Sequence, residues 1–163
     1  MKKRPLGSTG IDVAPIGLGA AQLSSSEYDH SREIVFKALD TGVNYFDTAE
    51  CYWDSEVKLG KALKGERESV IISSKTCGKT KEEAANHVDE SLQKLQTDYI
   101  DNYHLHNLTD MDDMNLRLGG PLEALLEARE AGKIKNIGIT GHTFPSVLVA
   151  ALKCFDFDTF LVP

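Results

Sequence analysis

Positive charge is scarce in this sequence, which carries 18 lysines and arginines against 25 acidic residues and has a net charge of -7 at pH 7. Proteins that bind nucleic acids concentrate lysine and arginine, because these residues displace counterions from the phosphate backbone. The charge balance therefore predicts no nucleic-acid partner. Long apolar runs are also missing. Without a stretch of about 20 apolar residues, we expect no membrane-spanning helix.

Cysteine is equally sparse. The three cysteines, Cys51, Cys77 and Cys154, have neither paired nor metal-ligand spacing, which predicts free thiols in a reducing cytoplasm. The basic start at residues 1–5 is not followed by the apolar segment of roughly 7–15 residues that a secretory signal needs. We therefore expect a cytoplasmic protein. The glycine patterns of dinucleotide-binding open sheets and of phosphate-binding loops are absent too.

What the sequence does contain is a regular alternation of short β-type runs with amphipathic helical segments. This alternation predicts βαβ units and a parallel sheet within a single domain, residues 1–163. An opening hairpin is predicted for residues 3–6 and 11–13, around the turn residues 7–10. The other strands are predicted near residues 16–19, 43–47, 70–74, 99–105, 135–140 and 158–162.

Apolar stripes at helical spacing separate these strands. The best-defined stripe, residues 84–95, follows a Thr80–Glu83 pair with capping-box spacing, in which both side chains satisfy free backbone N–H groups. Gly132 is predicted to end the fourth helix, and Pro145 to begin the fifth. The stripes contain Ile34, Val35, Ala38 and Leu39; Leu59, Ala62 and Leu63; Ala84, Val88, Leu92 and Leu95; Leu122, Leu125 and Leu126; and Val147, Leu148, Ala151 and Leu152.

The predicted order is a hairpin, about five βα units and a sixth strand. This is an α/β chain that corresponds to an incomplete (β/α)8 TIM barrel, since a closed barrel needs eight strands and usually about 250 residues. A doubly wound open sheet is also compatible with the number and spacing of the units. The motifs have to decide between the two architectures.

Four chemically suggestive residues lie at or just after predicted strand ends: Asp47, Tyr52, Lys75 and His106. Barrels hold their active sites at this end of the strands. Hydride attack on a carbonyl leaves an alkoxide that needs a proton, and Tyr52 is the natural donor. A Lys75 ammonium beside it would favour the phenolate, Asp47 would hold that lysine, and His106 would hydrogen-bond the substrate oxygen.

The surrounding residues resemble the signature of the aldo-keto reductase family. The match begins with Gly42-Val43-Asn44-Tyr45-Phe46-Asp47-Thr48-Ala49-Glu50-Cys51-Tyr52, Ser55-Glu56 and Leu59-Gly60-Lys61-Ala62-Leu63. Further pieces follow in family order: Leu6-Gly7-Ser8-Thr9-Gly10, Ile72-Ser73-Ser74-Lys75, Asp98-Tyr99-Ile100-Asp101, Leu105-His106, Gly132-Lys133-Ile134-Lys135 and Ile137-Gly138-Ile139. The resemblance covers nearly every residue of the chain.

This resemblance implies an oxidoreductase that reduces an aldehyde or ketone by hydride transfer from NADPH. It implies a catalytic tetrad of Asp47, Tyr52, Lys75 and His106, with Tyr52 as the general acid. The cofactor contacts that it implies are Gly19, Ala20, Asp47, Thr140 and Gly141. Its partner would be a small-molecule carbonyl substrate.

The chain departs from the family pattern at a few places. Trp53 stands where the family usually has glycine, and Thr140-Gly141 replaces a Ser-Asn pair that holds the nicotinamide. A Gly-Ile-Thr-Gly-His segment like residues 138–142 is found in a branch related to iron-sulfur-containing reductase-like proteins. The C-terminal part of the family barrel has no counterpart here. A truncated, catalytically incompetent chain acting as a binding or regulatory module is therefore the competing hypothesis.

Three further interpretations bear on the predicted site. Asp47 and Lys75 alone are also compatible with a purely structural ion pair. A metal site from His104, His106 and His142 with Cys51 or Cys77 lacks a ligand-spacing motif, so no metal is expected. Asn102 and His104 share a strand side with His106 and would make the barrel interior polar.

The open edges of an incomplete barrel predict that the chain self-associates.

Overall fold

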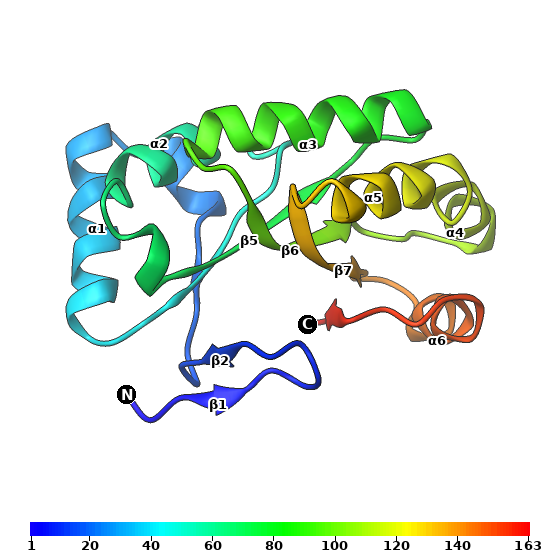
Figure 1. The fold of residues 1–163 in the computed structure, drawn as a ribbon, viewed down its shortest axis with the longest axis horizontal. Helices are drawn as coiled ribbons and strands as arrows, with labels where there is room; N and C mark the ends of the chain where they lie inside the picture. The colour runs from blue at the N-terminus through cyan, green and yellow to red at the C-terminus, as the bar shows by residue number, and fades with distance from the viewer.

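The computed structural model describes residues 1–163 and contains a six-stranded, all-parallel sheet whose strands follow one another in sequence order (Figure 1). The strands are β3 (Leu18–Gly19), β4 (Tyr45–Asp47), β5 (Ile71–Thr76), β6 (Ile100–Leu105), β7 (Ile134–Thr140) and β8 (Thr159–Leu161). Doubly wound sheets reverse their strand order at a switch point, whereas barrel strands run in sequence. The fold is therefore a half-barrel, as predicted, and the doubly wound alternative is excluded.

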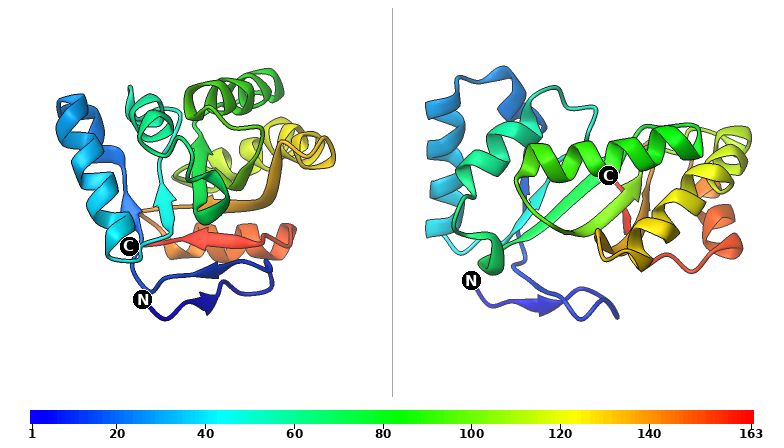
Figure 2. Two further views of the ribbon diagram at one scale, coloured as in Figure 1. Left: turned by 60° about the vertical axis from the view of Figure 1, so that its left-hand side comes forward. Right: turned by 45° about the horizontal axis from the view of Figure 1, so that its top comes forward.

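Helices connect the strands and lie around the outside of the curled sheet (Figure 2). They are α1 (Tyr28–Asp40), α2 (Ser55–Ala62), α3 (Lys81–Leu95), α4 (Met111–Arg117), α5 (Gly120–Glu130) and α6 (Pro145–Cys154), with short 3-10 helices η1 (Ala21–Ser25) and η2 (Arg67–Ser69). No helix combines the length and the apolar character that crossing a bilayer requires.

The predicted hairpin is present as β1 (Arg4–Pro5) and β2 (Asp12–Val13), and it lies apart from the sheet in Figure 1. Asn44, just before β4, ties it to the barrel. Its Oδ1 accepts a hydrogen bond from the backbone N–H of Ala14 at 2.7 Å, and its Nδ2 donates to the carbonyl of Asp12 at 2.9 Å. Because Asn44 precedes its strand, the hairpin lies at the amino end of the sheet and leaves the carboxyl end uncovered.

The local helix signals are confirmed. Thr80 and Glu83 form the capping box of α3. Gly132 follows the end of α5 with a φ of 74°, a conformation that glycine adopts without a Cβ clash, and Pro145 is the first residue of α6. One helix was missed. α4 has only seven residues, and its N-cap is Asp110, whose side chain accepts from the N–H of Asp113.

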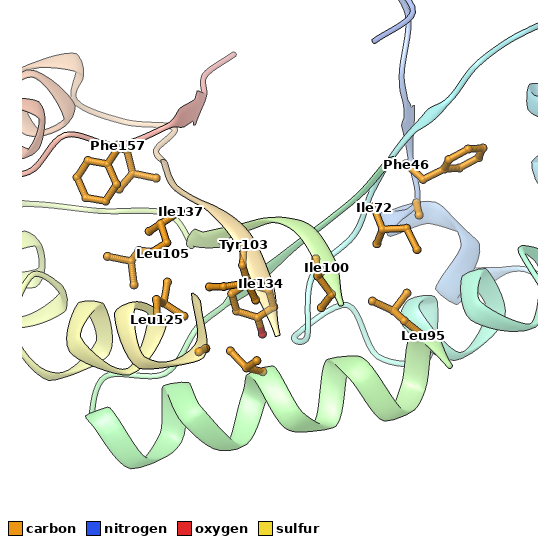
Figure 3. Close-up of a cluster of buried hydrophobic side chains, with 14 of the residues drawn as sticks. Phe46, Ile72, Leu95, Ile100, Tyr103, Leu105, Leu125, Ile134, Ile137 and Phe157 are labelled. Carbon is orange, nitrogen blue, oxygen red and sulfur yellow. The ribbon is translucent and has the colours of Figure 1, made fainter. Parts of the chain in front are cut away.

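The main core lies between the sheet and its outer helices, and it contains 27 buried apolar residues. Figure 3 shows Tyr103 and Ile134 from the sheet pointing toward the helical layer that supplies Leu95 and Leu125. Tyr103 is fully buried, and its hydroxyl lies 3.1 Å from the Ser91 hydroxyl of α3. Its phenol therefore has a polar partner inside an otherwise apolar layer.

Polar residues line the other side of β6. Asn102 and His104 are buried there, and their contacts agree with the polar interior that the alternation predicted. Asn102 donates to the Tyr45 hydroxyl at 3.2 Å, while the His104 Nε2 lies 3.0 Å from the Thr159 hydroxyl. Burial lowers the pKa of His104 to about 4, so this imidazole is neutral across the physiological range.

We expect His104 to make the protein sensitive to acid. Its pKa is about 4 in the folded chain and about 6.5 when unfolded, so the unfolded state binds more protons between these values. Stability is therefore complete above pH 6.5 and falls as pH decreases toward 4. Between pH 7 and pH 5 this group contributes a loss of about 2 kcal/mol. Urea unfolding of the wild type and of His104→Gln at both pH values measures it, and an equal pH dependence in the two proteins would contradict the assignment.

Candidate active site

The carboxyl end of the sheet brings the four predicted site residues together. Asp47 is the last residue of β4, Lys75 is next to last in β5, and His106 directly follows β6. Tyr52 lies in the turn between β4 and α2. Since neighbouring parallel strands end at the same edge, residues from distant parts of the chain meet there.

Lys75 and Asp47 form a close ion pair. The Lys75 Nζ lies 2.6 Å from Asp47 Oδ2 and also donates to the Thr48 carbonyl, while its side chain is only 1% exposed. The Ser73 hydroxyl donates to Asp47 Oδ1 at 3.0 Å. A buried ammonium is stable only with such partners, so the carboxylate and the carbonyl hold Lys75 charged and oriented.

The Tyr52 hydroxyl lies 3.4 Å from His106 Nε2, and the Lys75 Nζ lies 5.0 Å from the centre of the Tyr52 ring. Burial, followed by the negative charge of Asp47, raises the pKa of Tyr52 to about 12. The sequence argument expected Lys75 to favour the phenolate. In the structure, Lys75 is bonded to Asp47, and the combined environment keeps the Tyr52 hydroxyl protonated.

Thr140, one of the residues predicted to hold the cofactor, contacts the segment that follows β6. Its hydroxyl lies 3.0 Å from His106 Nδ1 and accepts from the N–H of Asn107 at 2.7 Å. The contact fixes the orientation of the His106 ring and leaves Nε2 directed at Tyr52. Thr140 thus lies in the site, directly beside His106.

Arg117, which the sequence analysis did not single out, binds backbone carbonyls next to the site. It comes from the unpredicted α4, is 4% exposed, and donates to the carbonyls of Thr76 and Gly78 at 3.2 and 2.7 Å. It also donates to the His106 carbonyl at 3.1 Å. One guanidinium therefore joins the segments that follow β5 and β6. The only sequence signal for this role is the i,i+4 spacing of Arg117 and Asp113, which form an ion pair.

The remaining predicted cofactor residues are spread along the same edge. Gly19 pairs with Asp47 in the sheet and has open space where a Cβ would stand. Ala20 is fully buried, and its N–H donates to the Asp47 carbonyl at 2.7 Å. Gly141 lines a hollow of about 390 Å³ with His142 and other residues around the start of α6. The Asn107 Oδ1 near this edge is buried without a hydrogen-bond partner.

Two thiols lie beside these residues. Cys51 directly precedes Tyr52, Cys77 follows β5, and both are free. Interaction with the Cys77 thiol, followed by interaction with His106, lowers the pKa of Cys51, while interaction with Cys51, followed by burial, raises the pKa of Cys77. The sequence analysis interpreted both as free thiols and considered only one of them at a time as a metal ligand, because residues 51 and 77 meet only through the pairing of β4 with β5.

Trp53 gives a physical reason for the glycine that is usual at its position. Its φ is 51°, in the left-handed region where a side chain is strained, and its side chain is 87% exposed. The turn that presents Tyr52 therefore keeps its backbone conformation although a bulky residue occupies the glycine position.

The aldo/keto reductase family matches residues 15–159. L-galactose dehydrogenase of Arabidopsis thaliana is 35% identical over 85% of this chain and 48% of its own length, and the aldo-keto reductase YhdN of Bacillus subtilis is 33% identical over 88% and 48%. The chain spans about half the length of these curated relatives. The holo form of aldo-keto reductase AKR11C1 from Bacillus halodurans superimposes with a TM-score of 0.88 at 33% identity, over 99% of this chain and 57% of that one.

Proposed function

The chain belongs to the aldo/keto reductase family, and on this basis we propose that it reduces an aldehyde or ketone with NADPH as the hydride source. The observation that carries the proposal is the convergence of one proton donor, one buried ion pair and one imidazole at the open end of the half-barrel. Tyr52 and His106 approach each other while Lys75 and Asp47 lie directly beside them.

The residues of the chain provide the proton side of the reaction. When hydride reaches the carbonyl carbon, the oxygen becomes an alkoxide and takes the proton of the Tyr52 hydroxyl. Tyr52 carries its proton before that step, as an unshifted tyrosine also would, and its raised pKa means that burial and the Asp47 charge oppose loss of this proton. Lys75, whose Nζ lies 5.0 Å from the centre of the Tyr52 ring, is a cation beside the phenolate that remains, and His106 orients the substrate oxygen. Asp47 keeps Lys75 in place.

The residues at the edge fit a nicotinamide cofactor, whose chemistry here would be to donate the hydride. The Asn107 Oδ1 is a buried acceptor without a donor, which the amide of the nicotinamide would satisfy. Gly19, at the same edge of the sheet, has open space where a Cβ would stand. The partner of the protein would be a small carbonyl compound.

The free sides of β3 and β8, with Phe160 59% exposed, further support self-association of the 163-residue chain.

The test is a fluorescence titration of the purified chain with NADPH, followed by NADPH oxidation with a panel of small aldehydes and ketones. We expect saturable binding and carbonyl-dependent oxidation. Sedimentation of the same sample reports its association state. Absence of binding at millimolar NADPH would contradict the proposal for this chain and favour the non-catalytic binding or regulatory module.

A further inference from the structure

Three potential metal ligands converge at the carboxyl end of the sheet. Cys51 Sγ, Cys77 Sγ and a ring nitrogen of His106 all lie within 4.8 Å of one another. They come from the segments that follow three successive strands, β4, β5 and β6. No other compact set of this kind occurs among residues 1–163.

The donor set suits a thiophilic divalent cation. Two thiolates and one imidazole are a known donor set for Zn²⁺, with bonds of about 2.3 Å to sulfur and about 2.0 Å to nitrogen. In a tetrahedral site these bonds place the ligand atoms about 3.5–3.8 Å apart. The present separations therefore need to shrink by about 1.3 Å at most. Cys51 lies in a turn and is exposed, so its side chain has room for this movement and the ion has access.

The environment of His106 also matches that of a metal ligand. Metal-binding histidines usually coordinate through one ring nitrogen while a hydrogen bond holds the other. At His106 the Thr140 hydroxyl lies 3.0 Å from Nδ1, whereas the Tyr52 contact at Nε2 is longer, at 3.4 Å. Nε2 is therefore the nitrogen that is more readily released to an ion.

We propose that Cys51, Cys77 and His106 form a binding site for a thiophilic divalent cation such as Zn²⁺, with its fourth position open to solvent. The ion displaces the thiol protons and takes the imidazole away from Tyr52. Because His106 has a role in the proposed carbonyl reduction, metal binding then inhibits that activity. This last consequence rests on the proposed function, whereas the metal site itself does not.

The test uses Cd²⁺, because cadmium thiolates absorb in the ultraviolet. The chain is kept reduced with a non-thiol reductant and titrated with Cd²⁺. We expect one ion per chain and a thiolate-to-metal absorption band, which Zn²⁺ suppresses by competition. Cys51→Ser and Cys77→Ser each lose most of this band. Cys154→Ser is the matched control, since its thiol lies at the end of α6, and it keeps the full band.

The cadmium NMR signal of the wild type should shift in His106→Gln, which shows that nitrogen is a ligand. Circular dichroism of each variant confirms that it is folded. The proposal is overturned if folded wild type gives no saturable band, if a folded Cys51→Ser or Cys77→Ser variant keeps it, or if Cys154→Ser removes it. Because the readout is spectroscopic, a chain without reductase activity still tests the metal site.

Discussion

Replacing Tyr52 by phenylalanine is expected to lower kcat for carbonyl reduction by at least about 100-fold, the usual minimum for removal of a general acid. Only the hydroxyl is lost, and its one contact in the structure is the 3.4 Å approach to His106. The Lys75–Asp47 ion pair does not involve this hydroxyl. The NADPH affinity and the unfolding midpoint should therefore change little.

The measurement is steady-state NADPH oxidation together with an NADPH titration of the same variant. Tyr99→Phe is the matched control, because it removes a phenolic hydroxyl just before β6, at the opposite end of the sheet. It should retain wild-type kcat. A Tyr52→Phe variant that keeps more than half of the wild-type kcat would rule out Tyr52 as the proton donor.

The parts of the fold that depend on local chemistry could be predicted from the sequence. The Thr80 capping box and the Pro145 start depend on residues within one turn of each other, and both are present. The predicted strand bounds also agree with the observed ones to within about two residues. The order of the strand ends also predicted that Asp47, Lys75 and His106 share one edge of the sheet, and all three lie there.

The missed features depend on contacts that no local pattern records. α4 is short and carries few apolar residues, so its helical period is weak, yet Arg117 from this helix holds two strand ends together. Cys51 and Cys77 lie 26 positions apart in the sequence. Only the pairing of β4 with β5 brings them together, and this is why spacing gave no indication of a shared site.

The Tyr52 environment shows a further limit of sequence reasoning. The nearby lysine was identified correctly, but its effect depends on where the ammonium points and on how far the phenol is buried. Lys75 is bonded to Asp47 and Thr48, and burial of Tyr52 is the largest influence on its pKa. The balance between a neighbouring charge and desolvation is a property of the folded site.

Gly138→Ala is expected to destabilise the fold by about 3 kcal/mol, at the upper end of the cost of overpacking a core. Gly138 in β7 pairs with His104 on one side and Thr159 on the other. An added Cβ would stand 2.6 Å from the Thr159 carbonyl oxygen and closer still to both side chains. The Thr159 carbonyl oxygen is held by the sheet, so it cannot move away from the added Cβ as the end of a flexible side chain could.

The matched control is Gly19→Ala, which adds the same methyl group to a strand glycine of the same sheet where nothing lies within 4 Å. Its unfolding free energy should stay within about 0.5 kcal/mol of wild type. Urea unfolding at pH 7 compares the two variants. Equal midpoints would show that β6, β7 and β8 can separate without cost. A large difference in unfolding free energy would show that β6, β7 and β8 pack closely at Gly138, because only a hydrogen atom fits between His104 and Thr159.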